Sequence, residues 1–298
     1  MRVELEVAAV RRLSELFYPS FASPLFDIDE SGALKRWGHC RGLVVKVLGS
    51  RKYAVSHELA ECLEYAIYVV GAWLDLERAA KTASKRGKRI LEALSEAYEG
   101  FGIATSPLDD RELFASIFLS RNTNYHTNTV KWMRKILELH GGLVGEPPST
   151  VSRSYQVGQL PEALECYAGL RSLILEKRSW RELLLCRNVG PKTSRAFALH
   201  VLLEPRVAPL DVNAERLASY LGIKRWKMRP NKALCLANTC SSCPARSNCG
   251  GAAFEELFGD AAGWVQTIAF VHVDAYCSRG ACASCPLAEM CHRDPKIQ

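Results

Sequence analysis

Apolar positions recur at helical spacing along most of the chain. The clearest case follows Asp110, which can cap a helix whose apolar face is formed by Leu113, Phe114, Ile117 and Phe118. The same period predicts helices at residues 1–18, 58–100 with a break near 87, 128–140, 161–176, 180–186, from 191 onward, and 262–275. Glycine, proline and serine predict a loop at residues 143–160. We therefore expect a mostly α fold.

Two short strands interrupt this helical pattern. Residues 43–48 and 53–56 are rich in β-branched residues and flank Gly49-Ser50, which suits a hairpin turn. Nothing else in residues 1–108 indicates a particular chemistry. We expect a helical N-terminal region with a small β-hairpin, a scaffold that packs partly with the C-terminal lobe.

Length and charge narrow the class of protein. A chain of 298 residues suits two lobes better than one core. Its longest apolar stretch, residues 65–74, is much shorter than the roughly 20 residues of a membrane span. No signal peptide is visible, so we expect an intracellular protein, cytoplasmic or nucleoid-associated, without a membrane partner. The net charge of +7 favours a polyanionic partner, and five cations cluster at Lys224, Arg225, Lys227, Arg229 and Lys232. Such a cluster is also typical of a solvated face.

The twelve cysteines fall into two groups. In an intracellular protein they are expected to bind metal rather than to form disulfides. Four are scattered among apolar residues and are predicted to be small buried side chains: Cys40, Cys62, Cys166 and Cys186. The other eight repeat one spacing, C-x4-C-x2-C-x5-C, first at Cys235, Cys240, Cys243 and Cys249, then at Cys277, Cys282, Cys285 and Cys291.

Each repeat supplies the four thiolates that a [4Fe-4S] cluster or a structural zinc requires. Zinc knuckles favour two C-x2-C pairs, whereas each repeat has one. We therefore predict a [4Fe-4S] cluster in the second loop, residues 277–291. For the first loop, residues 235–249, we predict a second [4Fe-4S] cluster, with zinc as the alternative. All four ligands come from the protein, so both sites are expected to be structural rather than catalytic.

Two helices flanking Asn188-Val189-Gly190 form a helix-hairpin-helix pattern. Asn and Gly tolerate the left-handed backbone of such a turn. Backbone N–H groups there can hold a phosphate without reading sequence. Many non-enzymes share this pattern and place a lysine after the hairpin, so Lys192 by itself is weak evidence for catalysis.

Asp211 adds a second functional group. It can cap the helix that follows it, where N–H bonds favour the ionised carboxylate. The helix after Lys192 rises roughly 18 Å. An extended segment at 204–210 can return about 23 Å, so both side chains can meet at one cleft.

These motifs together resemble the endonuclease III superfamily. The resemblance rests on Asn-Val-Gly-Pro-Lys-Thr at 188–193 and Leu-Asp-Val-Asn-x-x-Arg-Leu at 210–217. It also includes the helix running into Tyr276-Cys277 and the run Cys-Ala-Ser-Cys-Pro at 282–286. Leu-Ser-Arg-Asn-Thr-Asn at 119–124 resembles the segment that inserts beside a flipped base, with Asn122 where the family usually has glutamine. The resemblance covers about 109–223 and 260–293.

The resemblance implies a two-lobed helix-hairpin-helix DNA glycosylase fold with C-terminal iron–sulfur loops. It divides the chain into the N-terminal region 1–108, a helical domain 109–205 with the hairpin motif at about 180–203, and a lobe 206–298 with the aspartate helix and the cysteine loops. It implies that Lys192 attacks C1′ of an everted nucleotide while Asp211 stabilises the developing charge, followed by β-elimination. The expected partner of a monomer is double-stranded DNA with a damaged base or an abasic site. The expected DNA contacts are Arg121, Asn122, Asn188, Val189, Gly190, Thr193, Lys224, Arg225, Lys227 and Arg229.

Departures from the family leave the substrate open. Asn188 replaces the usual first hairpin glycine, and the Leu-Asp-x-Asn-x-x-Arg run is closer to the adenine-excising branch, whereas Lys192 belongs to the oxidised-pyrimidine branch. We expect a bifunctional glycosylase/lyase of base excision repair acting on an oxidised base, with pyrimidines ahead of 8-oxoguanine. The alternatives are a non-catalytic DNA-damage binding protein, an adenine- or mismatch-specific glycosylase, and an electron-transfer protein. Ferredoxins use closer cysteine spacing, which disfavours the last.

Overall fold

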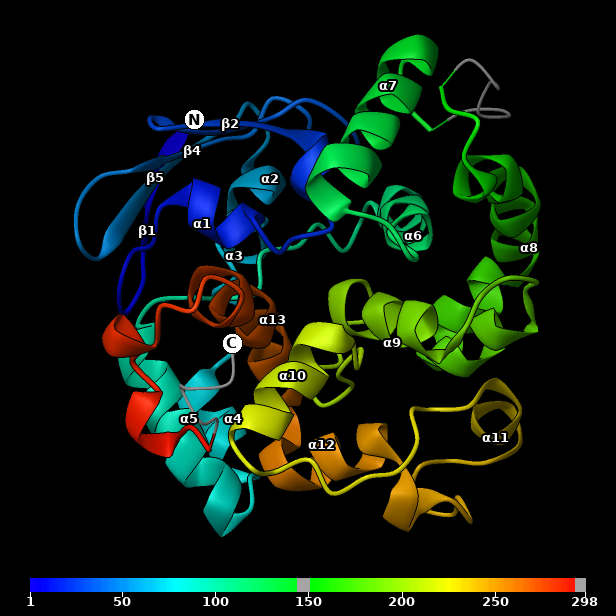
Figure 1. Cartoon of the computed structure of the whole chain (residues 1–298). Helices are drawn as coiled ribbons and strands as arrows, with labels where there is room; N and C mark the ends of the chain where they lie inside the picture. The colour runs from blue at the N-terminus through cyan, green and yellow to red at the C-terminus, as the bar shows by residue number, and fades with distance from the viewer. Residues whose placement is uncertain (144–150, 293–298) are drawn as a thin grey trace. The chain divides into compact units, whose positions relative to one another are not determined.

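The computed structural model describes residues 1–143 and 151–292, which group into two compact units (Figure 1). Unit 1 comprises Met1–Trp73, Gly100–Val189 and His200–Leu203. Unit 2 comprises Leu74–Glu99, Gly190–Leu199 and Glu204–Gln298. Among the described helices, none combines the length and the apolar character that crossing a bilayer requires.

Unit 1 begins with a five-stranded antiparallel sheet of order β1-β5-β4-β3-β2. Its strands are β1 (Arg2–Glu6), β2 (Phe26–Asp29), β3 (Gly32–Lys35), β4 (Val44–Val47) and β5 (Lys52–Ser56). The predicted hairpin is confirmed, because β4 and β5 pair from Val44↔Ser56 to Val47↔Tyr53. The predicted helix at 1–18 is wrong. Residues 2–6 alternate polar and apolar, which is the period of a strand, and only α1 (Leu13–Phe17) is helical.

The rest of unit 1 is helical. Its helices are α2 (Ala60–Glu64), α3 (Ala66–Val69), α6 (Asp110–Leu119), α7 (Val130–His140) and α8 (Tyr155–Lys177). Every residue from Leu113 to Leu119 in α6 is buried, and α6 packs on α8 with the Phe114 and Tyr167 rings stacked at 4.7 Å. Ser154 caps α8, so helix replaces part of the loop predicted at 143–160. Residues 144–150 of that loop lie outside the described residues.

Unit 2 contains α4 (Leu76–Lys81), α5 (Lys85–Ala97), most of α9 (Pro191–His200), α10 (Val212–Tyr220), α11 (Lys232–Ala237), α12 (Gly250–Phe258) and α13 (Ala262–His272). Helix α13 is buried along nearly its whole length and contacts α5, α10 and α12. The helical stretch is interrupted between Lys81 and Lys85, just before the break predicted near Gly87. Gly87 itself lies inside α5, where a Cβ would clash with the carbonyl of Leu257. Both units together confirm a mostly helical chain with a small N-terminal antiparallel sheet.

Unit 1 also holds two disulfides, Cys40–Cys62 and Cys166–Cys186. The prediction that these four cysteines are buried thiols is therefore wrong, although all except Cys166 are buried. The partners are 22 and 20 residues apart and share no local motif. Tertiary packing brings them together, and spacing alone does not indicate it.

Candidate active site

Asp211 is the N-cap of α10, as the sequence predicts. Its Oδ1 accepts hydrogen bonds from the backbone N–H of Asn213 at 3.0 Å and of Ala214 at 2.8 Å. Its Oδ2 accepts a third bond, at 3.0 Å, from Nε2 of Gln266. Three donors therefore fix both carboxylate oxygens.

Lys192 lies in the first turn of α9 with an exposed side chain. Its positive charge acts on Asp211 and lowers the pKa of that carboxyl, as do the three hydrogen bonds. Burial is the larger effect, so the pKa of Asp211 lies above its ordinary value. The lysine and the aspartate that the sequence predicts as a pair therefore lie in the same unit, near enough for the lysine charge to lower the pKa of the carboxyl. A raised pKa makes this carboxylate a better proton acceptor than an exposed aspartate.

Gln266 is a site residue that sequence reasoning missed. It is buried in α13, between Val265 and Thr267, where nearly every neighbour is apolar and buried. A buried amide requires hydrogen-bond partners, and Asp211 supplies one. The available signal was a glutamine in a helix with apolar residues on all faces.

Arg195 is a second missed residue. It lies one turn after Lys192 on α9 and is 1% exposed. Its Nε donates to the carbonyl of Ala208 at 2.8 Å, its Nη2 pairs with Glu255 of α12, and its Nη1 lies 4.0 Å from Cys240 Sγ. One guanidinium therefore connects the lysine helix, the segment leading to Asp211 and the first cysteine loop.

The hairpin has the expected left-handed residue at Asn188, with φ of 61°. Gly190 is not left-handed, and a Cβ there would meet no described atom within 4 Å. Val189 and Thr193 are buried, so their side chains are not available to a ligand. Arg121 acts from within unit 1: its Nη1 donates to the carbonyl of Asn188 at 2.6 Å.

The other expected DNA contacts differ in their surroundings. Arg121 also donates to Gln159 and to the carbonyl of Phe118, so its guanidinium is engaged inside unit 1. Asn122 is exposed with φ of 48°. In unit 2, Arg229 forms two hydrogen bonds with Glu215, at 2.9 and 2.6 Å. Of the other four cations in that cluster, Lys232 is half-buried and three are exposed: Lys224, Arg225 and Lys227.

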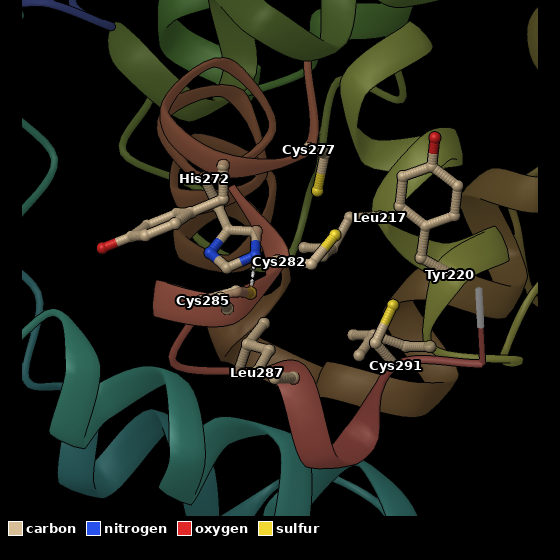
Figure 2. Close-up of a pocket in the computed structure, with 12 residues that line it drawn as sticks. Leu217, Tyr220, His272, Cys277, Cys282, Cys285, Leu287 and Cys291 are labelled. Atoms are coloured by element: carbon tan, nitrogen blue, oxygen red, sulfur yellow. Dashed lines mark hydrogen bonds between the residues drawn. The ribbon is translucent and has the colours of Figure 1, made fainter. Parts of the chain in front are cut away.

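The second cysteine loop surrounds a cavity of about 470 Å³ (Figure 2). Cys277, Cys282, Cys285 and Cys291 line it together with apolar side chains of α10, among them Leu217. The structure keeps all four as thiols, and burial raises the pKa of Cys285. No three of their sulfurs come within 4.8 Å of one another in the described structure.

The cysteines of the first loop have the same intermediate exposure as those of the second. The four in the first loop are partly buried thiols: Cys235, Cys240, Cys243 and Cys249. A parallel bridge between Met228 and Cys249 ties its end to the cationic segment. The one tight cluster of possible ligands among the described residues is His39, Cys40 and Cys62. Its two sulfurs form a disulfide and are therefore not thiolate ligands.

Comparisons with known proteins address the fold. No family model matches the chain, and no curated protein matches it. Solved structures do match. The 8-oxoguanine glycosylase/lyase of Clostridium acetobutylicum in its apo form matches with a TM-score of 0.67 at 14% identity, over 90% of this chain and 95% of that one. The 3-methyladenine DNA glycosylase of Archaeoglobus fulgidus matches with 0.63 at 13% identity, over 93% and 99%. MBOgg1 bound to a low-affinity DNA ligand matches with 0.64 at 17% identity, over 90% and 94%.

These three matches span nine-tenths or more of the chain. They include most of the N-terminal residues that the sequence resemblance leaves out. The chain therefore has the helix-hairpin-helix DNA glycosylase fold.

Proposed function

We propose that the protein is a DNA glycosylase with AP lyase activity, which excises a damaged base and then nicks the strand. The observation that carries the proposal is a partly buried Asp211, fixed by three hydrogen bonds, that feels the charge of Lys192 inside unit 2. A module that only binds DNA needs a cation beside phosphate but no fixed carboxylate next to it. The fold supports the proposal, because its solved relatives include glycosylases and glycosylase/lyases.

In the proposed reaction, Lys192 must first lose a proton. Asp211 accepts it, which its raised pKa favours. The neutral Nζ then attacks C1′; the Nζ–C1′ bond forms as the glycosidic bond breaks, and the base leaves with the bonding electrons and takes up a proton. The C1′–O4′ bond then opens, O4′ takes up a proton to become a hydroxyl, and Nζ loses its proton, which gives the imine. The imine allows loss of the C2′ proton and cleavage of the C3′–O bond, with the phosphate as the leaving group. Gln266 keeps Asp211 oriented throughout.

The hairpin is the proposed phosphate contact. Gly190 has neither a left-handed φ nor an internal neighbour that requires glycine, among the described atoms. Close approach of an external backbone explains the glycine better. The N–H groups at the start of α9 suit a phosphate there. Arg121 supports the contact indirectly by holding the Asn188 carbonyl.

The substrate we propose is a duplex with an oxidised base. We place 8-oxoguanine before oxidised pyrimidines as the candidate base. The sequence motifs favour pyrimidines. The matches to 8-oxoguanine enzymes, however, cover 90% of this chain, including much of the N-terminal scaffold. Because this chain shares its N-terminal region with those enzymes, we propose that it acts on the same lesion. The 3-methyladenine enzyme is an equally broad match and keeps alkylated adenine in the test panel.

We propose that the second cysteine loop holds a [4Fe-4S] cluster. Four free thiols that line one cavity, at the repeated C-x4-C-x2-C-x5-C spacing, support such a group. Bound there, it would supply structural cohesion. The loop packs against Leu217 and Tyr220 of α10, the helix that Asp211 caps. For the first loop we propose a second cluster, with zinc as the alternative.

Borohydride trapping tests the catalytic proposal. Purified protein is mixed with duplexes containing an abasic site, 8-oxoguanine, an oxidised pyrimidine or 3-methyladenine, and covalent adducts are resolved on a denaturing gel. We expect trapping and nicking in the wild type, and loss of both in Lys192→Ala by about three orders of magnitude or more. Lys88→Ala, which removes an exposed lysine of α5 in the same unit, should trap normally. Undiminished trapping by Lys192→Ala would refute the assignment, and DNA binding without any trapping would favour a damage-binding protein.

A further inference from the structure

His272 joins the second cysteine loop to the interior of unit 2. Its imidazole is 1% exposed, at the end of α13. Its Nδ1 lies 2.8 Å from the hydroxyl of Tyr98, which follows α5. Its Nε2 lies 3.5 Å from Cys285 Sγ, the contact drawn as a dashed line in Figure 2. Both ring nitrogens therefore have polar partners, and one partner is a candidate cluster ligand.

The chemistry of the partners fixes the tautomer. A thiolate bound to iron has lone pairs and no proton, so it can only accept a hydrogen bond. Nε2 must then carry the hydrogen. A neutral imidazole leaves Nδ1 as an acceptor, and the Tyr98 hydroxyl donates to it.

The surroundings make this hydrogen bond strong. Leu217 and Leu287 line the cavity beside it, and the Tyr276 ring lies 5.1 Å from the imidazole. Apolar walls reduce screening, so an N–H group directed at a sulfur has more effect than the same group in water. Hydrogen bonds to cluster sulfurs stabilise the more electron-rich state and raise the reduction potential.

We propose that His272, oriented by Tyr98, donates a hydrogen bond to the Cys285 sulfur and so raises the reduction potential of the second cluster and protects it from oxidation. The inference rests on the iron–sulfur part of the proposed function. The first loop has a different donor, the Arg195 guanidinium at 4.0 Å from Cys240 Sγ. The two loops share one spacing but present different groups to their sulfurs.

The experiment measures reduction potentials of the full-length protein as purified, by voltammetry, with iron content and electron paramagnetic resonance as controls. His272→Leu should shift one potential to a more negative value and speed bleaching of the visible absorption by ferricyanide several-fold. His272→Gln, which keeps an N–H donor, should restore part of the shift. Tyr98→Phe should give a smaller shift of the same sign. Tyr276→Phe, which removes a hydroxyl from the neighbouring ring, should give none.

The outcomes separate this inference from the proposed function. Normal iron content with unchanged potentials in both His272→Leu and Tyr98→Phe would refute the hydrogen bond while leaving the enzyme proposal intact. A wild type without iron would refute the cluster and this inference together, whereas borohydride trapping would still report on Lys192. Should His272→Leu lose its iron, Tyr98→Phe decides: a negative shift supports the proposal, and an unchanged potential overturns it.

Discussion

The two units of the chain use their cysteines in opposite ways. In unit 1, four cysteines that share no local motif form two disulfides. In unit 2, eight thiols occupy two short loops of identical spacing. One set crosslinks segments that tertiary packing has brought together. The other has a local geometry suited to a group that the protein must acquire.

A sequence reveals metal-binding cysteines more readily than it reveals disulfides. Cysteines that bind one metal group can be recognised by their spacing along the chain, because four ligands must converge on one point. Disulfides at separations of 22 and 20 residues carry no such mark. The two units should therefore respond to different treatments, unit 2 to loss of metal and unit 1 to reductant.

The largest effect should come from removing one ligand of the second loop. Cys285→Ala should lose the iron of that loop and destabilise α10, and with it Asp211. Structural metal sites in small domains contribute on the order of 10 kcal/mol, so we expect loss of trapping and a lower unfolding temperature. Iron analysis and thermal unfolding measure this. The matched variant Cys166→Ala removes a unit 1 cysteine and should keep all its iron. Equal iron loss in both variants would contradict the claim that only the unit 2 cysteines bind iron.

The fold was predictable where patterns are local. The hairpin at β4 and β5, the α6 face built on Leu113 and Phe114, and the start of α9 at Pro191 follow from period, turn and proline signals. The strand at residues 2–6 was missed although its alternation of polar and apolar residues is a local signal. Its place in the sheet depends on pairing with β5, about fifty residues further on, which no local pattern indicates.

The site was predictable to the same extent. Asp211 was expected as a helix cap, since that role depends on its immediate neighbours. Gln266 and Arg195 were missed, because their roles depend on contacts with segments distant in the chain. A glutamine among apolar residues was a usable signal. The sequence contains no comparable signal for Arg195, whose guanidinium contacts several segments.

The second-largest effect should come from removing the cation of a buried ion pair in each unit, which lowers the free energy of unfolding. In unit 2, Arg195 pairs with Glu255; in unit 1, Lys35 pairs with Asp109 and is fully buried. Removing the cation from a buried pair costs about 3–5 kcal/mol, because the carboxylate is left without its partner. Arg195→Met and Lys35→Met should therefore lower the free energy of unfolding similarly in denaturant titrations.

Their activities should differ. Arg195 lies on the helix of Lys192 and holds the segment before Asp211, so Arg195→Met should slow single-turnover nicking by about tenfold or more. Lys35→Met should leave nicking of the folded fraction unchanged. If both variants slow nicking equally, Arg195 has no positioning role of its own.

The third effect is on unit 1 alone. Removing a disulfide that closes a loop of this length costs about 3 kcal/mol. Cys40→Ala/Cys62→Ala and Cys166→Ala/Cys186→Ala should each lose about that much, as measured by urea unfolding, with iron content unchanged. The second pair should also weaken DNA binding several-fold, because Cys186 joins α8 to the start of the hairpin. If both double variants bind DNA equally well, the Cys166–Cys186 disulfide does not support DNA binding through the hairpin.

The smallest effect is a pH dependence of opposite sign in the two units. In unit 1, burial lowers the pKa of His200 to about 3, and its Nδ1 has no hydrogen-bond partner within the described chain. The unfolded chain takes up this proton near pH 6.5, whereas the folded one does not until about pH 3, so stability falls as pH decreases between those values. In unit 2, the raised pKa of Asp211 acts in the other direction, because the folded state binds its proton first as pH falls.

His200→Phe isolates the first of these effects. The ring is buried, and Phe21 meets it edge-on at 5.1 Å, so phenylalanine can fill the same space. Each pH unit below 6.5 should cost the wild type about 1.4 kcal/mol more than the variant, or roughly 2 kcal/mol at pH 5 relative to pH 7. Urea unfolding of both proteins at the two pH values gives this difference, and any acid loss from the cysteine loops cancels between them. A variant as acid-sensitive as the wild type would mean that His200 is not the group that makes unit 1 acid-labile.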